Sequence, residues 1–294
     1  MKKLVLIDGN ALVHRAFHAI PPLTTKKGEI VNAVYGFISI LFKVLNELKP
    51  EYVAATFDLA GPTFRHEEFE DYKATRVKGP QELYDQLGRV KQVVAALNIP
   101  IYEKEGFEAD DVIGTLARQA KEEIKDDLEI IIVTGDLDTL QLINEKVKVY
   151  TLRKGIKDVT LYDKKSVEER FGGLGPNQMA DFKGLKGDPS DNIPGVPGIG
   201  EKSAISLLKE HGTLEDLYDN LYLLPQKISA KLEENKDQAF FSKYLATIKT
   251  NVPVQLDLQK CKLHDYDENE VRKLFGELEF HSLLNRLPRK ENGN

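Results

Sequence analysis

Strand-like runs alternate with helical patterns along the first half of the chain. Four runs rich in β-branched and aromatic residues have the length of strands, at 3–7, 52–57, 99–102 and 129–133. Stretches with a 3.6-residue apolar period lie between them or after them, at 34–48, 83–97 and 112–124. This alternation predicts an α/β fold, in which helices cover both faces of a central, mainly parallel sheet.

An acidic residue follows each of the four predicted strands. Asp8, Asp58 and Asp136 come within three residues of a strand end, and Glu108 follows a little later. In open parallel sheets the ligand crevice lies beyond the carboxyl ends of the strands. Carboxylate oxygens are the ligands that Mg²⁺ prefers. The sequence therefore predicts a metal site at this edge of the sheet.

Nine acidic residues gather in five short clusters at element junctions: Asp8, Asp58, Glu108, Asp110, Asp111, Asp136, Asp138, Asp188 and Asp191. An aspartate between a strand and a helix is, taken alone, more often a helix cap than a metal ligand. Nine acids at one edge would repel one another unless cations compensated them. Two divalent ions about 3.5–4 Å apart would do so, and such pairs catalyse phosphodiester hydrolysis.

The spacing within the clusters favours shared ligand sites. Asp136 and Asp138 are two apart on a predicted extended segment, so that both side chains point the same way. Glu108 and Asp111 are three apart at a predicted helix start and share a face. The last cluster has the same spacing, with Pro189 as the predicted first helical residue.

Composition narrows the class of protein. The chain of 294 residues has no apolar run near the ~20 residues that a membrane helix needs. Its single cysteine, Cys261, cannot form an internal disulfide, which favours a reducing cytoplasm. The net charge of −6 includes the nine clustered acids, and the remaining residues alone would carry +3. Global charge therefore neither excludes nor favours nucleic acid as a ligand.

The second half of the chain is mostly helical in pattern, with glycine- and proline-rich joints at 172–176 and 195–200. We expect an α/β core over 1–172, a helical part over 173–287 and a frayed polar tail over 288–294.

Several motifs in this order resemble a known family. They are LIDGN at 6–10, TFRHE at 63–67, YKATR at 72–76, EADDVIGTL at 108–116, TGD at 134–136, KGLKGD at 183–188 and SDNIPGVPGIGEK at 190–202. Together they resemble the 5′ nuclease domain of bacterial DNA polymerase I, within the flap endonuclease family. The resemblance runs to about residue 287. It implies a PIN-like 5′ nuclease fold with a helix–hairpin–helix element at 195–200.

The resemblance also implies a division of the acids between two Mg²⁺ ions, with Mn²⁺ as an alternative. The first ion would be held by Asp8, Asp58, Glu108 and Asp110. The second would be held by Asp136, Asp138 and Asp191, with Asp110 bridging. Asp111 and Asp188 would act directly or through water.

The resemblance implies a helical arch at about 62–92 that meets a 5′ single strand. Lys73 and Arg76 would reach the scissile phosphate and, with Asp111, form the catalytic set. The implied DNA contacts are Arg15, Tyr72, Lys73, Arg76, Lys78, Gly195, Gly198, Gly200 and Lys202. For Tyr72, base stacking and packing against the arch remain alternatives. The glycine hairpin would grip duplex backbone without reading sequence, with K⁺ as a further ligand.

The implied activity is that of a 5′-3′ exonuclease and flap endonuclease acting in primer removal and repair. Its partners would be DNA or RNA–DNA with a 5′ flap, nick or 5′ end, and a covalently linked polymerase domain. We expect a cytoplasmic, nucleoid-associated monomer.

Three other classes of protein compete with this interpretation. A haloacid-dehalogenase-like phosphatase would need a second aspartate at position 10, where the chain has Asn10. PIN-type ribonucleases are usually shorter and lack the glycine hairpin. A non-catalytic module that binds DNA junctions stays open as the alternative function.

Overall fold

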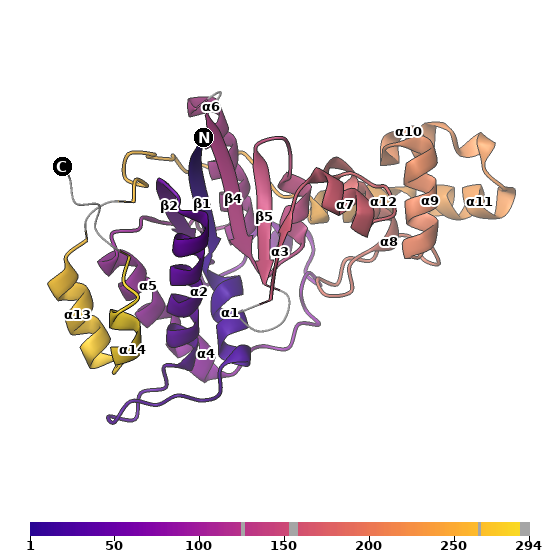
Figure 1. Cartoon of the computed structure of the whole chain (residues 1–294). Helices are drawn as coiled ribbons and strands as arrows, with labels where there is room; N and C mark the ends of the chain where they lie inside the picture. The colour runs from indigo at the N-terminus through magenta and orange to yellow at the C-terminus, as the bar shows by residue number, and fades with distance from the viewer. Residues whose placement is uncertain (125–126, 153–157, 264–265, 289–294) are drawn as a thin grey trace.

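A six-stranded sheet forms the centre of the molecule (Figure 1). The computed structural model describes residues 1–124, 127–152, 158–263 and 266–288. The strand order is β3-β2-β1-β4-β5-β6, in which β5 and β6 are antiparallel and all other neighbours are parallel. The strands are β1 (Lys2–Asp8), β2 (Tyr52–Thr56), β3 (Ile101–Tyr102), β4 (Leu128–Thr134), β5 (Val147–Leu152) and β6 (Val159–Tyr162). The expected α/β fold with a mainly parallel sheet is confirmed.

Each central strand is buried on both faces. In β1, Leu4 and Leu6 join one hydrophobic cluster, whereas Val5 and Ile7 join another. The alternation follows from the two-residue period of a strand. Helix α6 (Ala109–Glu123) covers the first face. The other face is covered by α1 (Gly9–Ala19), α2 (Asn32–Leu48) and α5 (Leu87–Ala96).

The sequence analysis did not predict the strands β5 and β6. No α-helix of the described residues separates β4 from β5, and the short 3₁₀ helix η1 (Asp138–Leu142) takes that place. The expected extended segment therefore stops before Asp138, which begins η1.

A group of helices lies beyond the β5 side of the sheet (Figure 1). Its elements are α7 (Lys164–Arg170), η2 (Pro176–Gln178), α8 (Met179–Lys186), α9 (Glu201–His211), α10 (Leu214–Asp219), η3 (Leu221–Leu223), α11 (Gln226–Glu234) and α12 (Lys236–Ala246). The chain then returns along α6, where the Arg118 side chain donates to the Thr250 carbonyl at 2.7 Å. This return connects the helical group to the sheet.

The last helices lie back on the α/β core, beside α2 and α5 (Figure 1). They are α13 (Glu268–Glu277) and α14 (His281–Leu284). Phe275 packs against Phe42 of α2 with ring centroids 6.2 Å apart. The helical residues after 173 are therefore not confined to one separate body. Of the expected tail, all but Pro288 lies outside the described residues.

The segment 62–92, expected as a helical arch, is only partly helical. It contains α3 (Phe64–Glu68), turns over 70–75, α4 (Gln81–Asp85) and the start of α5. None of the helices in the described ranges has the length and apolar character needed to span a bilayer.

Candidate metal centre and nucleic-acid interface

The structure brings the strand-end acids together in one cleft. Five of them line this first cleft, beside Lys73 and Arg76: Asp8, Asp58, Glu108, Asp110 and Asp136. An adjoining second cleft shares Glu108, Asp110 and Asp136 with the first and adds Asp138 and Asp191. Asp138 begins η1 and Asp191 lies in the turn after α8, whereas the other acids come from the ends of β1, β2 and β4 and from the start of α6. Parallel strands deliver them to one edge, as the alternation predicts.

Asp8 combines a capping role with a place in the first cleft. One carboxylate oxygen accepts from the Ala11 amide at 3.0 Å at the start of α1, and the other accepts from the Thr134 hydroxyl at 2.6 Å. Burial, with smaller effects of Asp58 and Asp136, raises the pKa of Asp8 to about 7. Asp58 likewise accepts from the Ala109 amide at 2.7 Å. Asp8 and Asp58 therefore also cap helix starts, the role that is commonest for a single aspartate between a strand and a helix.

Asp110 stands where the two clefts meet. Burial raises its pKa well above the ordinary value, and the nearby carboxylates of Asp136 and Asp8 raise it further. A cation bound beside such a group favours its ionised form. Its place between the clefts suits a bridging ligand.

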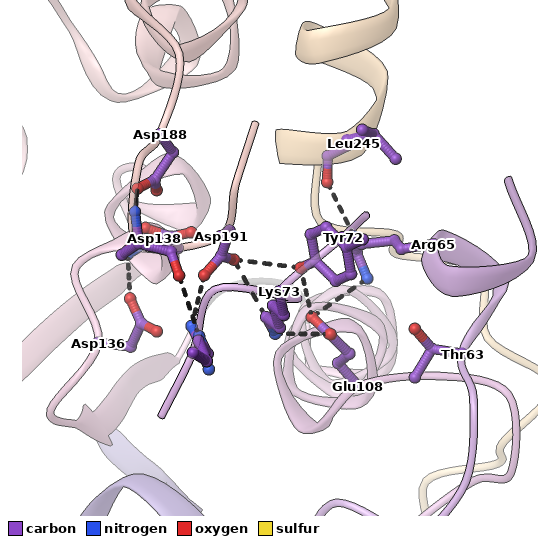
Figure 2. Close-up of polar contacts among 12 residues, drawn as sticks. Thr63, Arg65, Tyr72, Lys73, Glu108, Asp136, Asp138, Asp188, Asp191 and Leu245 are labelled. Carbon is purple, nitrogen blue, oxygen red and sulfur yellow. Dashed lines mark hydrogen bonds and ion pairs between the residues drawn. The ribbon is translucent and has the colours of Figure 1, made fainter. Parts of the chain in front are cut away.

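Three aspartates, Asp138, Asp188 and Asp191, lie close together near the second cleft (Figure 2). Asp138, Asp188 and Asp191 each offer an oxygen within 4.8 Å of the others, which makes them the one such triad among the described residues. No helix begins at Pro189, contrary to the sequence prediction. The chain instead turns back through an isolated antiparallel bridge between Asp188 and Ile193. A tight turn, rather than one helical face, brings these acids together.

Lys183 of α8 is the internal cation of this triad. Its ammonium donates to Asp188 at 2.6 Å and also contacts Asp138. Burial acts to lower the pKa of Lys183, but the carboxylates of Asp138 and Asp188 raise it overall. Despite this cation, burial and the charge of Asp136 raise the pKa of Asp138 to about 7. One lysine therefore does not compensate the group fully.

Asp111 does not fit the metal-ligand or catalytic role expected of it. Arg65 donates to both its oxygens, at 2.7 and 2.9 Å, and the Lys249 amide adds a third bond at 2.8 Å. The Asp111 side chain is fully buried and lines neither cleft. The helical spacing does place Asp111 beside Glu108, and its carboxylate accepts a hydrogen bond from the Glu108 amide at 3.1 Å. Its lone pairs are engaged inside the protein, so that it acts as a structural anchor.

Lys73 and Arg76 face the acids from the turn that follows α3. The Lys73 ammonium donates to Glu108 at 2.6 Å, and the Arg76 guanidinium donates to Asp191 at 2.5 Å. Figure 2 shows Lys73 between Asp191 and Glu108. Both cations are therefore within reach of a phosphate held at the clefts.

Three of the expected DNA contacts take other positions or stay outside the clefts. Tyr72 is buried, and its hydroxyl donates to Glu108 at 3.2 Å and Asp191 at 3.1 Å, which excludes base stacking in this conformation. Arg15 donates to the Leu152 carbonyl at 2.6 Å and lines neither cleft. Lys78 is exposed beyond the turn.

The glycine hairpin joins α8 to α9, as expected, but its glycines differ in use. Gly195 has a φ of +63°, and a Cβ there would meet the Gly187 backbone at 2.2 Å. Internal packing therefore requires a glycine here, and the expected contact of Gly195 with DNA stays a prediction. A Cβ at Gly200 would meet nothing within 4 Å, and Lys202 is exposed just beyond it. Gly198 faces the Lys231 ammonium.

Sequence reasoning gave no role to four residues of the site. Lys183 and Arg65 stood within recognised motifs, but their acidic partners lie far away or in another element. Thr134 donates to Asp8, and His14 lines the first cleft. These partners come together only in the folded chain, so that the pattern of acidic residues in the sequence does not indicate them.

Two family models match the chain in succession. The 5′-3′ exonuclease N-terminal resolvase-like domain matches residues 3–172, and the 5′-3′ exonuclease C-terminal SAM fold matches residues 174–269. DNA polymerase I of Chloroflexus aurantiacus is 50% identical over 292 residues, which are 97% of this chain and 31% of that protein. DNA polymerase I of Bacillus subtilis is 46% identical over 287 residues, which are 97% of this chain and 32% of that protein. The chain thus spans about a third of the length of these relatives.

Solved structures share the fold. The T5 5′-exonuclease with bound zinc has a TM-score of 0.68 and 20% identity, covering 95% of this chain and 99% of that chain. The catalytic core of Rad2 in complex with DNA has a TM-score of 0.60 and 19% identity, covering 94% of this chain and 87% of that chain. At this identity the likeness concerns the fold alone. On the two family models, the chain belongs to the 5′-3′ exonuclease family of nucleases.

Proposed function

We propose that the chain is a structure-specific 5′ nuclease that hydrolyses phosphodiester bonds near 5′ ends, nicks and flaps in DNA or RNA–DNA. The observation that carries this proposal is the convergence of acids on adjoining clefts, beside Lys73 and Arg76. These acids come from three strand ends, from the starts of α6 and η1, and from the turn after α8. The T5 and Rad2 structures, which hold metal ions and DNA respectively, support it.

The donor set fits two divalent ions. We assign the first to Asp8, Asp58, Glu108 and Asp110, and the second to Asp136, Asp138, Asp188 and Asp191, with Asp110 between them. Asp111 is left out because Arg65 occupies it. The oxygen-only ligands favour Mg²⁺, with Mn²⁺ as a substitute. When bound, such ions activate water and stabilise the leaving oxygen of an in-line displacement.

The residues of the chain have separate tasks in this reaction. Thr134 orients the Asp8 carboxylate, and Tyr72 spans Glu108 and Asp191. When substrate binds, Lys73 and Arg76 leave Glu108 and Asp191 and contact the scissile phosphate instead. There they stabilise its negative charge in the transition state. The open backbone at Gly200, with Lys202 and the Gly198 turn, binds duplex phosphates independently of sequence.

We further propose that K⁺ binds at the hairpin, and that the division near residue 172 separates a catalytic part from a duplex-binding part. The relatives' names support a linked polymerase domain. We also propose a role in primer removal and repair in the bacterial nucleoid. We expect a monomer. Equal DNA affinity in KCl and LiCl would remove the K⁺ from this proposal.

Cleavage of a labelled duplex with a 5′ flap tests the proposed function. We expect products with Mg²⁺, none with EDTA, and a loss of cutting in Asp136→Ala. Equal product in all three samples would contradict metal-dependent cleavage. Tight flap binding without any cleavage by the wild-type chain would favour the alternative, a non-catalytic module that binds DNA junctions.

A further inference from the structure

The turn that carries Lys73 and Arg76 lies against a second turn, and two of the hydrogen bonds between them end on backbone carbonyls without using the Lys73 or Arg76 side chain. The Lys73 amide donates to the Asp191 carbonyl at 2.9 Å. The Asn192 side-chain amide donates to the Asp71 carbonyl at 2.8 Å. The two bonds run in opposite directions between residues 71–73 and 191–192, and we call this pair of bonds the clasp.

Both sides of the clasp contain a residue with a left-handed backbone. Lys73 has a φ of +57° and Asn192 a φ of +58°. Residues other than glycine rarely adopt this backbone conformation, although asparagine tolerates it better than most. Such residues persist where the surrounding structure holds them, and they concentrate at functional sites. The clasp supplies that hold on both sides.

The clasp involves the backbone of the same two turns whose side chains include Lys73, Arg76 and Asp191. The Arg76 guanidinium donates to the Asp191 carboxylate at 2.5 Å and to the Ser190 carbonyl at 3.3 Å. The Arg76 bond to the carboxylate must open when Arg76 turns to a phosphate and Asp191 turns to a metal. The bonds of the clasp use neither the Asp191 carboxylate nor the Lys73 ammonium, so that they can remain during that exchange.

We propose that Asn192 is a positioning residue for the nuclease reaction. Its amide holds the Asp71 carbonyl and thereby keeps the turn 70–76 in the place from which Lys73 and Arg76 reach the clefts. Asn192 lines neither cleft. It acts through the backbone of the turn, and a misplacement of about 1 Å can slow an enzyme greatly. This inference rests on the proposed function.

Glycine at position 192 separates this role from a purely conformational one. Asn192→Gly keeps the left-handed backbone without strain and removes only the amide. If asparagine served the backbone alone, the glycine variant would behave as the wild type. Asn98→Gly is the matched control, because Asn98 also has a φ of +57° and lies after α5, away from both clefts.

The experiment measures Mg²⁺-dependent flap cleavage and amide hydrogen exchange over residues 70–78 in the free protein. For Asn192→Gly we expect kcat to fall on the order of 10-fold, KM to stay within about twofold, and exchange over 70–78 to quicken. Asn98→Gly should match the wild type in all three. Asn192→Asp, which places an acceptor against the Asp71 carbonyl, should be slowed at least as much.

Unchanged kcat and exchange in Asn192→Gly would overturn the inference, and so would a rise in KM alone, which would indicate a direct DNA contact. Failure of the wild type to cut any flap would instead refute the proposed function. In that case the exchange measurement would still decide whether Asn192 holds the turn.

Discussion

The guanidinium of Arg65 donates to both carboxylate oxygens of Asp111, and both side chains are buried. Arg65 also donates to the Leu245 and Thr247 carbonyls at 2.8 and 3.0 Å. The pair therefore joins α3, the start of α6 and the segment that leaves α12. Three parts of the chain that surround the clefts meet at this one ion pair.

Asp111→Asn should destabilise the protein by about 3–5 kcal/mol, because it leaves the buried Arg65 charge without its partner. Urea unfolding followed by circular dichroism measures this change. Glu268→Gln, which breaks the surface pair with Arg272, is the control and should cost no more than about 0.5 kcal/mol. If Asp111→Asn lowered the free energy of unfolding as little as Glu268→Gln, the buried pair would not hold these segments together.

Lys73→Ala should lower kcat by about 100-fold and change the dissociation constant for flap DNA much less. The reason is that its ammonium lies at the acids, where charge develops on the phosphate. Lys78→Ala is the control on the same segment. It should weaken DNA binding, reduce the salt dependence of binding by about one counterion and leave kcat unchanged. A loss in Lys73→Ala that appeared only in affinity would contradict this division.

The metal-free protein should lose stability as the pH rises from about 4 to about 7. Asp8 and Asp138 have pKa values raised from 3.8 to about 7, chiefly by burial. In that window the folded chain binds more protons than the unfolded chain, so that the free energy of unfolding falls with rising pH. Thermal unfolding in EDTA at several pH values tests this, and Asp8→Asn should flatten the slope.

Mg²⁺ should reverse this trend, because it binds the ionised carboxylates. The rise in melting temperature on adding Mg²⁺ should be larger at pH 8 than at pH 5.5. An equal rise at both pH values would place the ion elsewhere.

Lys183→Met should tighten Mn²⁺ binding several-fold, because the lysine ammonium competes with the ion for Asp138 and Asp188. Calorimetric titration gives the dissociation constant. Lys186→Met is the control, since Lys186 lies in the same helix but contacts Glu201 at 3.7 Å. Weaker binding in Lys183→Met would mean that the lysine orients the carboxylates rather than competing for them.

The sequence predicts the sheet edge well because parallel strands alternate with helices and an acid follows each strand. It does not predict β5 and β6, because the described residues 135–146 between β4 and β5 form no α-helix that would mark a crossover. Pro189 suggested a helix start, but the positive φ of Asn192 and the bridge to Ile193 form a tight turn instead.

Side-chain roles depend on partners that the sequence does not place side by side. Spacing puts Asp111 beside Glu108, yet Arg65, 46 residues earlier in the chain, removes Asp111 from the ligand set. For Tyr72 the sequence leaves base stacking and packing against the arch as alternatives, and the bonds of its hydroxyl to Glu108 and Asp191 decide for packing. Local patterns thus predict which residues approach the site, and tertiary contacts decide what each one does there.

Titration of Mg²⁺ into EDTA-treated protein at pH 8, followed by calorimetry, tests most directly whether the converging acids are a metal centre. We predict saturable binding of about two ions to the wild type and a loss of most of that binding in Asp110→Asn. No saturable heat, or the same isotherm in both proteins, would contradict the account.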